Sequence, residues 1–198
     1  MKKIQLIKQE NSNYDKKILI IGVFHGDEPQ GEYFINSYIK KDNAIGKNSL
    51  FFIPRLNFSN TRKNSNGVDL NRNFPTKNWE KGENNDYFSG ENPNSEPETQ
   101  YIVELMDKNK FDLIITIHAP YKVVNYDGPA ESIAKKASEF LGYKVTSDIG
   151  YPTPGSFGTY AGVERKIPVL TIEIDEDEDI EKLNLKFEKF FKWLKNEF

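Results

Sequence analysis

The chain has 198 residues, with 27 basic and 30 acidic side chains and a net charge of −3. This length suits one domain with a substantial core, so we expect residues 1–198 to form a single domain. The charge balance, without a block of basic residues, argues against nucleic acid as a partner. Because there is no cysteine, disulfides, thiolate ligands and a cysteine nucleophile are excluded, and any metal must be held by His, Asp or Glu.

The first residues, MKKIQLIKQENSNYDKK, lack the apolar core of a secretory signal, because polar residues interrupt them every few positions. The sequence also has no run of about 18 apolar residues that could span a bilayer. We therefore expect a cytoplasmic protein with no membrane partner.

Short segments rich in β-branched and aromatic residues predict strands that are buried on both faces of a sheet. They are KKILIIGVF (16–24), SLFFIPRLNF (49–58), FDLIITIHA (111–119) and IPVLTIEID (167–175). Helical periodicity lies between and after them, at about 29–41, 97–109, 130–141 and 179–197. This alternation predicts an α/β fold with a largely parallel or mixed sheet between helices.

Local signals refine these elements. Ser95 and Glu98 predict a capping box at the start of the second helix, with Pro97 in its first turn. The acidic run 173–181 predicts a charged entry to the last helix. The stretch from 60 to 94 shows no period, and a loop of that length in a compact domain is usually functional or disordered.

Reactive residues fall at the predicted strand ends, where sites form in open α/β sheets. His25 and Glu28 form an H-x-x-E pair after the first strand, and His118 ends another. Together they have the composition of a catalytic His2Glu zinc site. Glu173 ends a further strand and would be the general base beside such a site. In isolation, the histidines are read as turn caps and Glu173 as an ion-pair partner.

The long loop and the turn-rich stretch 150–162 add further candidates. Arg62 and Arg72 suit the binding of a carboxylate or an oxyanion, although a surface ion pair is the simpler reading of either. Asp69 is a candidate partner for a ligand histidine. Tyr151 and Tyr160 are candidates for a residue that closes over substrate.

These residues resemble the zinc metallocarboxypeptidases, which carry the same motifs in the same order. The likeness extends from about Ile18 to Ile174, and GVDLNRNFP, SEPETQ and GYPTPGSFG resemble the murein peptide amidases of that family most. The resemblance implies a mixed, twisted sheet of about eight strands between helices.

The resemblance also implies a role for each site residue. His25, Glu28 and His118 would bind one zinc ion, and Glu173 would activate the attacking water and protonate the leaving amine. Arg62 would polarise the scissile carbonyl. The substrate's terminal carboxylate would be held by Asn71 and Arg72, and Tyr151 would fold over it.

The resemblance implies a cytoplasmic reaction that recycles peptidoglycan fragments released from the cell wall. It is the hydrolysis of the γ-D-glutamyl bond in L-Ala-γ-D-Glu-meso-diaminopimelate, a small peptide with a free carboxylate. One departure is the pair Ala119-Pro120 after His118, where an acidic residue would be expected before the proline. We expect this change to alter substrate recognition, because the pair would border the cleft.

Two alternatives remain. One is a zinc amidohydrolase of the aspartoacylase and succinylglutamate desuccinylase type, which shares H-x-x-E and a DLNR-like stretch. The other is a non-catalytic zinc- or peptidoglycan-binding module, against which Glu173 argues because a structural site has no use for a base.

Overall fold

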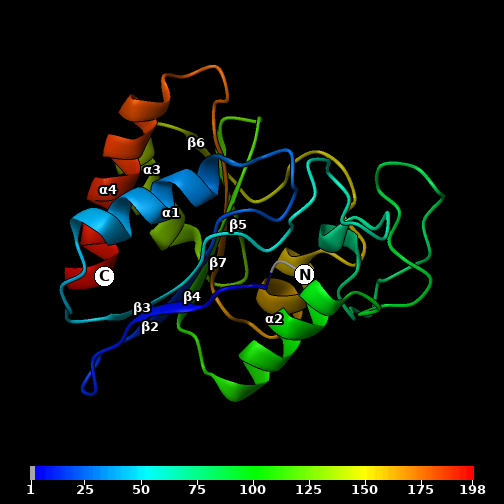
Figure 1. Cartoon of the computed structure of the whole chain (residues 1–198), viewed down its shortest axis with the longest axis horizontal. Helices are drawn as coiled ribbons and strands as arrows, with labels where there is room; N and C mark the ends of the chain where they lie inside the picture. The colour runs from blue at the N-terminus through cyan, green and yellow to red at the C-terminus, as the bar shows by residue number, and fades with distance from the viewer. Residues whose placement is uncertain (1–2) are drawn as a thin grey trace.

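The computed structural model describes residues 3–198. Its centre is a seven-stranded mixed sheet in the order β1-β3-β2-β4-β7-β5-β6 (Figure 1). The strands are β1 Ile7–Gln9, β2 Lys17–Ile21, β3 Ser49–Ile53, β4 Leu113–His118, β5 Val123–Asp127, β6 Lys144–Thr146 and β7 Val169–Glu173. Four adjacent strands are parallel to one another, in the order β3, β2, β4 and β7. β1 is antiparallel to β3, and β5 is antiparallel to β7.

Helices cover both faces of this sheet. They are α1 Gln30–Lys41, α2 Pro97–Lys108, α3 Glu131–Leu141 and α4 Ile180–Asn196. One apolar core joins α1, α3 and α4 to one face, and a second joins α2 to the other, as Figure 1 shows. In β2, Ile18 and Ile20 enter the first core and Leu19 and Ile21 the second, because successive strand side chains point to opposite faces. None of the helices within residues 3–198 is long and apolar enough to cross a membrane.

The predicted α/β class with a mixed sheet between helices is confirmed, and each predicted helix lies within one or two residues of its expected bounds. The described residues contain seven strands rather than about eight. Three of these, β1, β5 and β6, had not been predicted, because each is short or carries polar residues that break the apolar runs. The single domain expected over residues 1–198 stays a prediction, and its first two residues lie outside the described part of the chain.

The predicted capping box at α2 is wrong. Glu96, not Ser95, occupies the N-cap position, and its side chain makes no capping bond. The Ser95 hydroxyl instead donates to the Glu96 carboxylate, and Glu98 accepts from Asn64 Nδ2. These side chains are used to attach the long loop to the start of α2. At α4 the expectation is confirmed, because Asp179 caps the helix by accepting from the two backbone N–H groups of residues 181 and 182.

Irregular structure gathers at one end of the molecule, where the carboxyl ends of the parallel strands lie. Residues 60–94 hold only a short 3-10 turn, η1 Leu70–Arg72, in agreement with the expected long loop. The stretch 150–162, expected to be rich in turns, enters a π-helix, η2 Gly158–Glu164, which had not been predicted. Such π-helical turns are rare and often occur at functional sites.

Candidate metal centre and cleft

His25, Glu28 and His118 are brought together by two neighbouring parallel strands. His25 and Glu28 lie in the turn between β2 and α1, and His118 is the last residue of β4. Because β2 and β4 are parallel, their carboxyl ends open onto the same edge of the sheet. Gly26 lets the turn lie against the long loop, since a Cβ there would be 2.4 Å from the Ser59 carbonyl oxygen.

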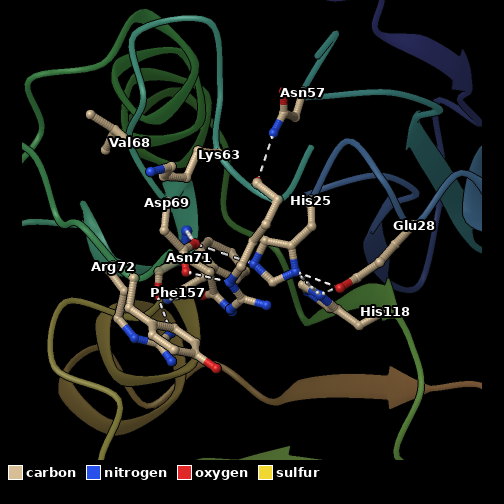
Figure 2. Close-up of polar contacts among 12 residues, drawn as sticks. His25, Glu28, Asn57, Lys63, Val68, Asp69, Asn71, Arg72, His118 and Phe157 are labelled. Atoms are coloured by element: carbon tan, nitrogen blue, oxygen red, sulfur yellow. Dashed lines mark hydrogen bonds and ion pairs between the residues drawn. The ribbon is translucent and has the colours of Figure 1, made fainter. Parts of the chain in front are cut away.

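The ligand atoms of these residues converge on one point, as Figure 2 shows. Glu28 Oε1 lies 2.8 Å from His25 Nδ1, Glu28 Oε2 lies 3.0 Å from His118 Nδ1, and the two Nδ1 atoms are 3.3 Å apart. Tetrahedral zinc with bonds of about 2.0–2.1 Å requires donor atoms roughly 3.3 Å apart. The three side chains therefore fit a zinc ion with small adjustments and leave further coordination positions open.

Asp69 supports this cluster from the opposite side of the His25 ring (Figure 2). Its Oδ1 lies 3.2 Å from His25 Nε2 and also accepts the backbone N–H of Asn71, while its Oδ2 accepts from Arg62 Nε at 2.9 Å. Asp69 is fully buried. It thus fixes the ring nitrogen of His25 that faces away from the cluster, as partners of metal-binding histidines do.

The shifted pKa values of the cluster favour the binding of a positive charge. Burial lowers the pKa of His25, but hydrogen bonds with Asp69 and Glu28 outweigh it and raise the pKa to about 9. Burial opposes ionisation of Glu28, yet the two imidazoles hold its pKa well below its usual range. Burial lowers the pKa of His118. A cation would replace the proton that His25 carries, since a ligand imidazole must be neutral.

Glu173 lies beside the cluster at the end of β7. It is directly paired in the sheet with His118, and it is only 7% exposed. Its Oε2 is buried without a hydrogen-bond partner among residues 3–198. Burial, with the nearby Glu28 carboxylate adding to it, raises the pKa of Glu173 to about 8. A buried carboxylate oxygen without a partner is costly, so this arrangement needs a bound group or a function to explain it.

Arg62, Asn71, Arg72 and Tyr151 also line this cleft. The Nε of Arg62 is held by Asp69. Asn71 is fixed by the Phe157 backbone N–H, which donates to its Oδ1, and Arg72 Nη1 donates to the Asn71 carbonyl. The long loop thus delivers both arginines to the same cleft.

The structure separates the two candidate tyrosines. Tyr151 is exposed at the cleft, with its ring centroid 6.4 Å from that of Tyr121. Tyr160 is completely buried, packs against Phe74 and has Arg165 over its ring. Tyr160 therefore cannot close over a substrate without leaving the core.

Ala119 lines the cleft, as expected, but sequence reasoning missed several other lining residues: Tyr121, Asn125, Asp127, Thr153, Ser156, Gly158 and Thr171. The polar residues at alternate positions of VVNYD (123–127) were the available signal. That signal is interpretable only once β5 is known to pair with β7.

Comparison with known proteins agrees with this geometry. Residues 1–187 match the sequence profile of the family described as zinc carboxypeptidase. Murein peptide amidase A of Vibrio campbellii is 32% identical over 188 aligned positions, and the match covers 83% of this chain and 73% of that protein. Murein peptide amidase A of Escherichia coli is 31% identical over 147 aligned positions, and the match covers 67% of this chain and 60% of that protein.

Solved structures show the same fold. The murein-tripeptide amidase of Escherichia coli O157 superposes with a TM-score of 0.83 at 24% identity, covering 95% of this chain and 86% of that one. Carboxypeptidase A of Helicoverpa armigera gives a TM-score of 0.77 at 15% identity, covering 96% of this chain and 63% of that one. The architecture is therefore that of the carboxypeptidases.

Proposed function

The chain belongs to the zinc carboxypeptidase family, and from this premise we propose that it hydrolyses an amide bond in murein peptides. The specific reaction proposed is release of meso-diaminopimelate from L-Ala-γ-D-Glu-meso-diaminopimelate, by one zinc peptidase domain formed by residues 1–198. The observation that carries this proposal is the convergence of His25, Glu28 and His118 beside the buried carboxylate of Glu173, whose Oε2 has no partner among residues 3–198. The similarity to murein peptide amidase A supports the choice of substrate.

Zinc held by His25, Glu28 and His118 would supply Lewis-acid activation of a water molecule and of the scissile carbonyl. We assign Glu173 the role of general base: it takes a proton from the attacking water and passes it to the nitrogen of the leaving amine. The unpartnered Oε2 of Glu173 supports this role, because nothing in residues 3–198 competes for the proton.

Arg62 is proposed to stabilise the negative charge that develops on the carbonyl oxygen. Its Nε is occupied by Asp69, so its terminal Nη groups are the donors left for substrate. Fixing one edge of the guanidinium in advance reduces the reorganisation that the reaction would otherwise require. Loss of one such donor typically costs about 3 to 4 kcal/mol in the transition state.

Arg72 and Asn71 are proposed to bind the terminal carboxylate of the substrate, and Tyr151 to fold over it. Support comes from their common location on the cleft wall and from the planar fork of the Arg72 guanidinium, which matches a carboxylate. This grip would place the scissile bond next to Glu173.

The place of the reaction is part of the same proposal. A free murein tripeptide is a product of cell-wall turnover, so we propose a role in peptidoglycan recycling in the cytoplasm. Cell fractionation with an antibody to the chain tests the compartment independently of the chemistry.

The decisive experiment incubates zinc-loaded protein with L-Ala-γ-D-Glu-meso-diaminopimelate and detects free meso-diaminopimelate by mass spectrometry. We expect release with the parent protein, and none after chelation of zinc or with zinc-loaded Glu173→Gln. N-acetyl-L-aspartate and N-succinyl-L-glutamate serve as comparison substrates. Hydrolysis of either in place of the tripeptide would reassign the chain to the aspartoacylase or desuccinylase reaction.

A further inference from the structure

Tyr87 lies in the long loop and has no role in the chemistry proposed above. The centroid of its ring is 4.8 Å from Arg62 Cζ and 5.6 Å from Arg72 Cζ. A guanidinium within about 6 Å of the centre of an aromatic face is attracted to it. One side chain therefore contacts both the group assigned to the carbonyl oxygen and the group assigned to the terminal carboxylate.

The other contacts of the two guanidinium groups leave part of each one free. Arg62 donates from Nε to Asp69, and Arg72 donates from Nη1 to the Asn71 carbonyl oxygen at 2.7 Å. Arg72 is only 5% exposed and forms no salt bridge among residues 3–198. A carboxylate partner would occupy the N–H groups that the substrate needs, whereas an aromatic face attracts the charge and leaves those donors available.

The chain around Tyr87 is attached to residues that support the site. The carbonyl oxygen of Phe88 accepts the backbone N–H of Asp69 at 2.8 Å, and the carbonyl oxygen of Ser89 accepts from Asn73 Nδ2 at 2.7 Å. The Tyr87 side chain itself is 48% exposed. The backbone thus fixes the position of the ring, and a smaller side chain at this position would not open the core.

Arg72 has space on two sides. It lines the metal-containing cleft, and it also lines a second recess together with Tyr87, Tyr151, Pro152 and Pro154. A long side chain between two open spaces has several conformations to choose from, and ordering it on substrate binding costs entropy. A ring that already attracts the guanidinium reduces that cost.

We propose that Tyr87 is a positioning residue for both arginines: its ring holds the two guanidinium groups at the cleft and leaves their N–H donors for the substrate. This inference rests on the proposed function, which assigns the arginines their roles. Tyr87 acts through Arg62 on the transition state and through Arg72 on binding of the terminal carboxylate. Loss of the ring therefore lowers kcat and raises KM together.

The kinetic test compares two substitutions in the zinc-loaded protein with the tripeptide as substrate. Tyr87→Leu removes the ring and should lower kcat and raise KM by about 2- to 5-fold each, the effect of one cation–π contact at a partly exposed site. Tyr87→Phe keeps the ring and should restore both constants. The matched control is Tyr14→Leu, since Tyr14 is 39% exposed, has Lys17 Nζ 5.1 Å from its ring centroid and does not line the cleft.

Double variants assign each effect to one arginine. When Arg62→Gln is already present, adding Tyr87→Leu should raise KM without a further loss of kcat. With Arg72→Ala present, the same addition should lower kcat without a further rise in KM. Additive effects in both backgrounds, a change confined to one constant, or a Tyr87→Phe variant as impaired as Tyr87→Leu would overturn the proposal.

A measurement by NMR separates this inference from the proposed function. The Nε–H signals of Arg62 and Arg72, assigned with Arg62→Gln and Arg72→Ala, should shift in Tyr87→Leu as the ring current is lost, and stay in place in Tyr87→Phe. Their heteronuclear NOE should fall in Tyr87→Leu, because the guanidinium groups become more mobile. This result would support the positioning role even if no peptide were hydrolysed, and unchanged shifts and NOE values would refute it.

Discussion

Replacing Asp69 by asparagine tests how the site is organised. Asp69 is the buried acceptor that joins His25, Arg62 and the backbone N–H of Asn71. Asparagine keeps the oxygen that faces His25 and Asn71 but places an NH2 group opposite Arg62 Nε, so two donors meet. The change also removes the negative charge that makes the His25 imidazole a stronger ligand.

The magnitudes follow from these contacts. Loss of a partner of this kind typically weakens metal binding about 10- to 100-fold, equivalent to about 1.4 to 2.7 kcal/mol. Release of Arg62 should lower kcat further, because a hydrogen bond to a charged group is worth about 1.5–3 kcal/mol. We therefore expect Asp69→Asn to bind zinc more weakly and, even when saturated with zinc, to turn over substrate more slowly.

Zinc affinity is measured by competition with a chromophoric chelator, and kcat by release of meso-diaminopimelate at saturating zinc. Arg62→Gln is the matched control, since it leaves the contact between Asp69 and His25 in place and should lose activity at unchanged zinc affinity. If Asp69→Asn bound zinc within twofold of the parent, the assignment of Asp69 as the support of His25 would be wrong.

Three further predictions concern single side chains. Glu173→Gln should lower kcat by about 10²- to 10⁴-fold with a full complement of zinc, measured by metal analysis; a fully active variant would remove Glu173 as the base. Arg72→Ala should raise KM for the tripeptide far more than it lowers kcat, and an unchanged KM would exclude Arg72 from carboxylate binding. Asp42→Asn, which leaves the buried ammonium of Lys195 without its ion-pair partner, should destabilise the fold by about 1–3 kcal/mol near pH 7. Lys195 holds the pKa of Asp42 below its usual range. The stabilisation is therefore present above the unfolded-state pKa of about 3.9 and is lost as pH falls through the lower folded value. A difference in melting temperature between the parent and Asp42→Asn that persists unchanged at pH 2 would contradict this reasoning.

The metal cluster could be predicted from sequence because each ligand lies at the end of an apolar run. Chain order alone places His25 after one buried strand and His118 at the end of another. Parallel strands open onto one edge of a sheet, so residues far apart in sequence meet there without further information. The core of the fold was predictable for the same reason, since β2, β3, β4 and β7 are continuously apolar.

Local patterns failed where a side chain had a better partner elsewhere in the fold. Ser95 and Glu98 have the spacing of a capping box, but the long loop brings Asn64 to Glu98, and Ser95 turns to Glu96. Tyr151 and Tyr160 are equivalent in sequence, yet only one is exposed at the cleft, because the π-helix turns Tyr160 into the core.

The sequence by itself therefore indicated the chemistry of the centre: which residues can bind a metal ion, that the Glu173 carboxylate lies at a neighbouring strand end, and that the long loop carries arginines. The character of the cleft beyond the metal was decided only by the tertiary structure. Asn125 and Asp127 reach the cleft because β5 pairs with β7, and Gly158 and Gly162 leave room for the Asp127 side chain. Such contacts join segments more than 30 residues apart in sequence, and no local propensity or spacing encodes them, because they exist only when the sheet has formed and the helix has packed against it.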